Sequence, residues 1–189
     1  LCGAAMASYK DWRPVAWEFD GLDASAAGHG DGTWWQYPAG ERSFTASSFD
    51  GDTASIAAVE QALLEGGYDG LLGFSQGAML AAIVAARAAL GEGVPSLKFA
   101  ICCAGAVPKP HEPLFQRLLE SDASIPTMHC LSRCDSVNPV EQGMALAEYF
   151  GPSAEIAWHD DGHTMPAGDA CKEVTAWLDR TGPLFKRVA

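Results

Sequence analysis

The sequence predicts an α/β fold in which a mostly parallel sheet is flanked by helices. Short apolar runs alternate with longer helical patterns along the chain, and this alternation is typical of β-α-β units. The length of 189 residues corresponds to about one domain, and an apolar share of 48% is that of a globular protein. We found no internal repeat and no linker. We therefore expect a single domain over residues 1–189.

The individual elements follow from apolar spacing and from helix-ending residues. The expected strands cover residues 15–19, 68–74, 97–103, 127–131 and, as the last, 154–158. The expected helices cover residues 53–65, 76–90, 114–120, 140–150 and 170–179. Residues 20–50 form a long loop rich in glycine and aromatic residues, and a loop of this length in a compact domain is usually functional or mobile.

Two of these helices carry predictions about which side chains are buried. In helix 53–65, the residues expected on the inner face are Ile56, Val59, Leu63 and Leu64, with Asp50 or Asp52 as the cap and Gly66–Gly67 as the end. In helix 114–120, the inward residues are expected to be Leu114, Leu118 and Leu119.

Composition excludes several classes of partner. A net charge of −12 argues against nucleic acids and anionic membranes, which require basic surfaces. No apolar run approaches the roughly 18 residues that a membrane span needs. The six cysteines include no C-x-x-C pair, so we expect no metal site and reduced thiols, as in a cytoplasmic protein. The chain begins with Leu1 and not Met, which weakens any conclusion about localisation.

The stretch Gly73–Gly77 carries the pattern G-x-S-x-G with Ser75 at its centre. An apolar strand precedes it and a helix follows it, and this context turns a common pattern into a candidate nucleophile. A sharp strand-to-helix turn would expose the serine hydroxyl, and glycines on either side would avoid a clash. The free backbone N–H groups of the new helix, beginning with Gln76, could bind a developing oxyanion.

Two further candidates lie at the same edge of the predicted sheet. Asp135 follows the strand that ends near residue 131, and His163 follows the strand that ends near residue 158. Chemistry in parallel sheets occurs outside the carboxyl ends of the strands. A serine needs a base to take its proton, and an acid must orient that base. We therefore predict Ser75 as nucleophile, His163 as base and Asp135 as the orienting acid.

Four other histidines are alternative candidates for the base. His129 lies within a strand and is expected in the core, whereas His29 and His111 lie in loops and are expected at the surface. His159 is the main rival, because it ends the same strand that precedes His163. Gly162 allows a tight loop that would bring the ring of His163 close to Ser75. This favours His163 over His159 as the base.

These motifs resemble the FSH family of serine hydrolases, a branch of the α/β-hydrolases. The matching segments are Gly73–Ala78, Ser132–Pro139 and Gly162–Pro166, with Trp34–Tyr37 as a weaker match, and the resemblance extends from about Trp17 onward. It implies an α/β-hydrolase-like fold and hydrolysis of esters or thioesters, often with medium or long acyl chains. It also implies no metal and no organic cofactor.

The resemblance fails at the N-terminus. The family is expected to begin with an apolar strand and a His-Gly loop that supplies a second oxyanion donor, whereas His29-Gly30 follows the wrong strand. The missing strand would lie beside the strand that precedes Ser75 and would leave part of the sheet unpaired. We therefore expect an N-terminally incomplete copy of a complete hydrolase.

The predicted function is cleavage of a small-molecule carboxylic ester, with thioesters as an alternative substrate. Trp34 and Trp35 either line a pocket for an apolar group or pin the long loop to the core, and the sequence supports both. A non-catalytic binding module with a disabled oxyanion hole is the alternative function. A nucleotide-binding domain is disfavoured, because the turn lacks both G-x-G-x-x-G and a phosphate-loop lysine. Oligomeric state is not predicted.

Overall fold

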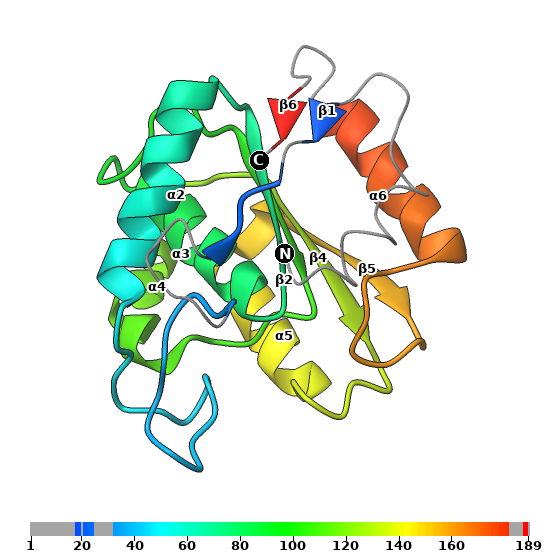
Figure 1. The fold of residues 1–189 in the computed structure, drawn as a ribbon. Helices are drawn as coiled ribbons and strands as arrows, with labels where there is room; N and C mark the ends of the chain where they lie inside the picture. Colours follow the sequence, from blue (N-terminus) through cyan, green and yellow to red (C-terminus); the bar gives the residue numbers. More distant parts are fainter. Residues whose placement is uncertain (1–17, 20, 25–31, 182–186, 189) are drawn as a thin grey trace.

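The computed structural model of the protein describes residues 18–19, 21–24, 32–181 and 187–188 (Figure 1). Helices and strands alternate along most of this chain, as the sequence predicts. Most of the strand expected at 15–19, and His29, lie outside the described residues.

One parallel sheet forms the centre of the molecule. Its strand order is β1-β6-β2-β3-β4-β5, and each pair of neighbours is parallel. The strands are β1 (Glu18–Phe19), β2 (Gly70–Phe74), β3 (Phe99–Cys103), β4 (Thr127–Ser132), β5 (Ala154–His159) and β6 (Arg187–Val188). The predicted α/β class is confirmed. The prediction that the strand near 154–158 is the last is wrong, because β6 follows it.

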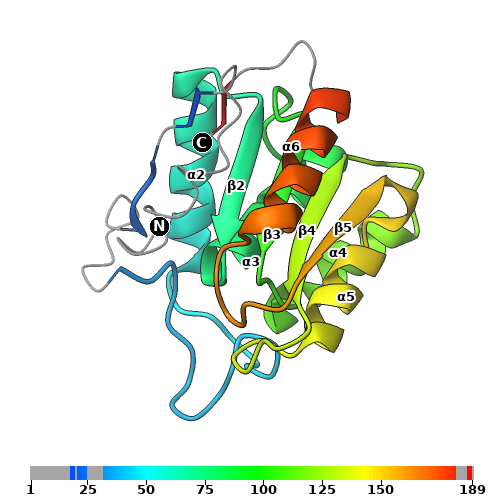
Figure 2. The ribbon, with the colours of Figure 1, turned by 90° about the vertical axis from the view of Figure 1, so that its right-hand side faces the viewer.

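Helices cover both faces of this sheet (Figure 2). They are α2 (Asp52–Gly66), α3 (Gln76–Ala89), α4 (Glu112–Leu119), α5 (Val140–Glu148) and α6 (Gly168–Thr181). Helix α6 packs on one face, and α2, α3, α4 and α5 lie on the other, where α3 crosses the centre. Each predicted helix exists, with ends shifted by a few residues.

The alternation of side chains along the strands produces two cores. In β2, Leu71 faces the helices α2 and α3, whereas its neighbour Leu72 faces the α6 side. Trp177 of α6 lies edge-on against Phe99 of β3, with ring centres 5.7 Å apart, and fills the second core. Successive strand residues point to opposite faces, so the buried strands β2 and β3 are apolar throughout, whereas β4 also buries Thr127, His129 and Ser132.

Three of the predictions about individual side chains are wrong. Leu64 and Leu119 are 57% and 52% exposed, since each lies at the edge of its helix's apolar stripe, and Phe115 is buried instead of Leu119. Helix α2 is capped by Gly51 without a side-chain bond, and Asp52, the first residue of the helix, pairs through Oδ2 with His111 at 2.7 Å. The predicted end at Gly67 is confirmed, with the left-handed conformation that glycine favours.

Strand β2 is paired unequally on its two sides. It pairs with β3 along its whole length, but on the other side β6 meets it only at Gly70. The N–H of Ser75 bonds to Cys103 of β3 at 2.9 Å, so by alternation the backbone groups of Leu72 and Phe74 point away from β3. Within the described residues, no strand pairs with them there, and a cavity lies along this edge.

Candidate active site

Ser75 occupies a strained turn between β2 and α3. Its φ of 54° and ψ of −118° lie outside the regions that side chains ordinarily adopt. A Cβ atom on Gly73 would overlap the carbonyl oxygen of Gly77, so the turn requires glycine at the first position. At Gly77 a Cβ would only touch the indole nitrogen of Trp34, at 3.4 Å. The turn therefore presents the serine hydroxyl at the carboxyl end of the central strand, as the sequence predicts.

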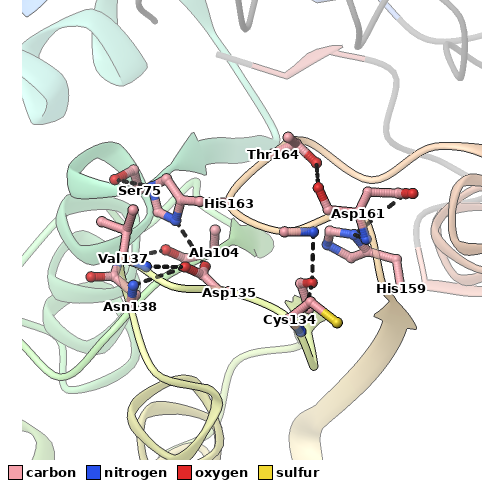
Figure 3. Close-up of polar contacts among 12 residues, drawn as sticks. Ser75, Ala104, Cys134, Asp135, Val137, Asn138, His159, Asp161, His163 and Thr164 are labelled. Atoms are coloured by element: carbon pink, nitrogen blue, oxygen red, sulfur yellow. Dashed lines mark hydrogen bonds and ion pairs between the residues drawn. The ribbon is translucent and has the colours of Figure 1, made fainter.

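The structure brings the three predicted residues into one chain of hydrogen bonds (Figure 3). His163 Nε2 lies 2.9 Å from Ser75 Oγ, and His163 Nδ1 lies 2.8 Å from Asp135 Oδ2. Both distances are within the range that proton transfer between a nucleophile and a base requires. The arrangement allows the imidazole to accept the serine proton while its other nitrogen donates to the carboxylate.

The carboxylate of Asp135 is held by its own loop. Its Oδ1 accepts N–H bonds from Val137 at 2.8 Å and Asn138 at 2.9 Å, and its side chain is only 3% exposed. Asn138 in turn donates from Nδ2 to the carbonyl of Ala104 in the loop after β3. These bonds leave Oδ2 directed at His163. The role of Asn138 was missed by sequence reasoning, although it lies inside the matching segment Ser132–Pro139.

The imidazole of His163 has support from an aromatic ring and from a tight turn. The ring of Phe74, which precedes the serine, lies 5.1 Å from it between centres. Gly162 has a φ of 77°, which glycine adopts without strain, so the prediction of a tight loop is confirmed. Both features restrict how the ring can rotate away from Ser75.

The other described histidines do not reach Ser75. His129 is buried between strands and helices, and burial lowers its pKa to about 3, so it is a neutral core residue as predicted. His159 is 7% exposed; its Nδ1 accepts the N–H of Asp161, and burial lowers its pKa. His111, expected at the surface, is half-buried and pairs with Asp52.

The buried thiols of Cys102 and Cys103 are poor candidates for the nucleophile. Burial raises the pKa of Cys102, and a hydrogen bond to Cys130 together with burial raises that of Cys103. Cys134 is exposed, and Cys171 donates to the carbonyl of Pro166. Thiols with raised pKa are poor nucleophiles, because the thiolate is the reactive form. Among the described residues, no group of three or more potential ligands is arranged to hold a metal ion.

The amino end of α3 lies directly beside Ser75. The N–H groups of Ala78 and Met79 bond to the carbonyl of Ser75, whereas those of Gln76 and Gly77 donate to no group in the described chain. Free N–H groups at a helix start attract negative charge. The side chain of Gln76, however, is already engaged: its oxygen accepts from Trp34 N–H at 2.6 Å and its nitrogen donates to the Trp35 carbonyl at 2.9 Å.

The two tryptophans point in opposite directions. Trp34 lines a cavity of about 310 Å³ that also borders Ser75, Gln76 and Gly77. Trp35 is 1% exposed and stacks on Phe49 with ring centres 4.7 Å apart, so it belongs to the core and does not line the cavity. The remaining walls of the cavity are largely apolar and include Leu22, Val59, Leu71, Leu72, Phe74, Leu80 and Ala81.

No helix in the described part of the chain is long and apolar enough to cross a membrane.

The solved structures with similar folds include the esterase PE8, with a TM-score of 0.60 at 23% identity. Acyl-protein thioesterase 2 of Zea mays has a TM-score of 0.58 at 22% identity. The alignments cover 78% and 79% of this chain, and 69% and 72% of the two structures. These likenesses establish the α/β-hydrolase fold.

Comparison with sequence relatives extends the assignment from the fold to the family. Esterase OVCA2 of Homo sapiens is 39% identical over 118 residues, which cover 60% of this chain and 50% of that protein. Esterase OVCA2 of Xenopus tropicalis is 30% identical over 173 residues, which cover 87% of this chain and 70% of that protein. The chain thus spans about half the length of the human relative it matches. The family profile described as serine hydrolase (FSH1) matches residues 7–174. The chain therefore belongs to the FSH1 family of serine hydrolases.

Proposed function

We propose that this protein hydrolyses carboxylic esters through an acyl-enzyme intermediate on Ser75. The observation that carries the proposal is the hydrogen-bond chain from Ser75 through His163 to Asp135. His163 takes the hydroxyl proton as Ser75 Oγ attacks the ester carbonyl, and it then returns that proton to the departing alcohol. A water molecule, activated by the same imidazole, releases the acid and regenerates the serine. Asp135 keeps the tautomer and stabilises the imidazolium.

The oxyanion of the tetrahedral intermediate would meet the start of α3. The unengaged N–H groups of Gln76 and Gly77 lie next to the nucleophile, and the helix dipole adds partial positive charge there. The two hydrogen bonds between the Gln76 side chain and the backbone of Trp34 and Trp35 support this role. They hold Gln76 in place, and its backbone N–H is the first oxyanion donor.

The cavity next to Ser75 favours an apolar substrate group. Its volume of about 310 Å³ is at the small end of the roughly 300–1,000 Å³ that small-ligand sites occupy. None of the described residues that line it has a charged side chain. We propose that the cavity takes the acyl chain of a neutral ester; a thioester would use the same attack and the same oxyanion donors.

Burst kinetics test this mechanism directly. With an activated p-nitrophenyl ester in excess, acylation is expected to be faster than deacylation, so the proposal predicts rapid release of one equivalent of nitrophenol before the steady state. Steady release without a burst, unaffected by removal of the Ser75 hydroxyl, would contradict an acyl-serine. A well-folded protein with no esterase activity would favour the non-catalytic binding module.

A larger side chain in the cavity wall should shift the substrate preference toward shorter acyl chains. Val59 of α2 is 3% exposed and lines the cavity, so Val59→Phe would fill part of it. We expect kcat/KM for long-chain p-nitrophenyl esters to fall about tenfold or more relative to acetate. Leu64→Phe on the same helix is the control, because Leu64 faces solvent. An unchanged chain-length profile in Val59→Phe would place the acyl chain elsewhere.

The indole N–H of Trp34 should hydrogen-bond to the substrate. Among the described residues this N–H has no hydrogen-bond partner. The indole N–H of Trp35 is fully buried, whereas that of Trp34 is accessible from the cavity. Trp34→Phe keeps an aromatic wall and removes one donor, so we expect kcat/KM to fall by about 3- to 10-fold, the value of one hydrogen bond. Trp35→Phe is the matched control and should leave ester hydrolysis unchanged. Equal effects of the two substitutions would refute the donor role.

A further inference from the structure

Asp135 and His163 belong to different loops, so their spacing depends on what joins the two loops as well as on their own hydrogen bond. Asp135 lies in the loop after β4, and His163 lies in the loop after β5. Both loops are at the surface, where residues on either side of the pair, such as Arg133 and Asp160, are exposed. A buried link between the two loops would hold the backbone on which Asp135 and His163 stand.

Ser132 supplies such a link. It is the last residue of β4, it is 2% exposed, and it pairs in register with His159 of β5. Its Oγ accepts the N–H of Cys134 at 3.2 Å and the N–H of Gly162 at 3.0 Å. A hydroxyl oxygen has two lone pairs, so one atom can accept both bonds. Figure 3 includes Cys134 and the neighbouring loop around Asp161 and Thr164.

The two bonded residues are the immediate neighbours of the proposed acid and base. Cys134 precedes Asp135, and Gly162 precedes His163. Fixing these two N–H groups to one buried oxygen fixes the backbone from which both side chains project. The ion pair between Arg133 and Asp160 also joins the loops, but its side chains are 56% and 65% exposed, and exposed pairs contribute little.

We infer that Ser132 is a positioning residue that sets the distance between Asp135 and His163 through these two bonds. This inference rests on the proposed function, because it concerns the same pair. Ser132 does not touch the substrate. Its loss would let the loops separate, and a displacement of about 1 Å in a catalytic group can lower the rate by about 10²-fold.

A double-mutant cycle separates positioning from general stability. The readout is the rate of Ser75 modification by a fluorophosphonate, followed by intact-protein mass spectrometry, together with kcat and KM for one ester. Ser132→Ala should lower the modification rate and kcat by about 10²-fold and leave KM nearly unchanged. In the Asp135→Ala background, where no side chain is left to contact His163, the same substitution should change the rate by less than about threefold.

Two further variants keep this test decisive. Ser121→Ala is the matched control, because the Ser121 hydroxyl also accepts a backbone N–H, from Ala123, but lies in the loop after α4. It should react at the wild-type rate. Ser132→Cys retains the shape of the serine with a weaker acceptor, and it serves if Ser132→Ala does not fold; we expect an intermediate loss.

The outcomes distinguish this inference from the proposed function. Equal fold-losses in both backgrounds, or wild-type rates in folded Ser132→Ala and Ser132→Cys, would overturn the positioning role while the triad stands. A folded wild-type protein that does not react with the fluorophosphonate would overturn the proposed function itself.

Discussion

The Ser75→Ala variant is expected to lose at least about 10⁴-fold in kcat toward any ester that the wild-type protein cleaves. The methyl group cannot attack a carbonyl, so no acyl-enzyme forms and the burst disappears. The residual rate would come from the oxyanion donors and from substrate binding alone. Initial rates with a p-nitrophenyl ester measure this loss.

The fold should tolerate this substitution. Ser75 Oγ bonds only to His163 among the described residues, so its removal breaks one hydrogen bond, to a side chain that is 17% exposed. Ser153→Ala, which removes a hydroxyl that donates to the carbonyl of Phe150, is a suitable control and should keep full activity. If Ser75→Ala retained more than about a tenth of the wild-type kcat, Ser75 would not be the nucleophile.

Asp135→Asn should lower kcat by about 10⁴-fold with little change in KM. The amide oxygen can keep the bonds from Val137 and Asn138, so the loop should remain in place. The amide nitrogen would then face His163 Nδ1 and donate to it. This tautomer places the proton on Nε2, which can no longer accept the proton of Ser75.

An exposed aspartate at the same edge controls for the loss of charge. Asp160→Asn removes the charge of a side chain that is 65% exposed and that, among the described residues, pairs only with Arg133, so its activity should stay within about twofold of wild type. Similar losses in both variants would indicate a general electrostatic effect, and the proposed orienting role of Asp135 would be wrong.

The positions of the three candidate residues could be predicted because each depends on local pattern. An apolar strand followed by G-x-S-x-G and a helix specifies the turn at Ser75, and a loop after a buried strand specifies the edge at which Asp135 and His163 lie. The parallel sheet then brings these loops together, although 88 residues separate Ser75 from His163.

The features that were missed depend on contacts between distant segments. Strand β6 has only two residues and exists through pairing with β1 and β2, so no periodicity reveals it. The Gln76 side chain bonds to residues 41 and 42 positions away. Ser132 shares its oxygen with Gly162, 30 residues on. None of these partners can be inferred from spacing in the sequence.

Helix faces were predicted with less accuracy at their margins. Leu64 and Leu63 are adjacent in α2, yet the first is 57% exposed and the second is fully buried. An apolar stripe covers about a third of a helix, so a residue at its border faces the core or solvent according to how the helix is rotated. That rotation is set by packing against α3, which the sequence pattern does not specify.

Identification of the modified residue would test the central claim most directly. The folded protein is treated with a fluorophosphonate, digested, and analysed by peptide mass spectrometry. The account predicts one adduct per chain, located on Ser75, and none after Ser75→Ala. An adduct on another residue, such as the exposed Cys134, or no adduct on the folded protein, would contradict it.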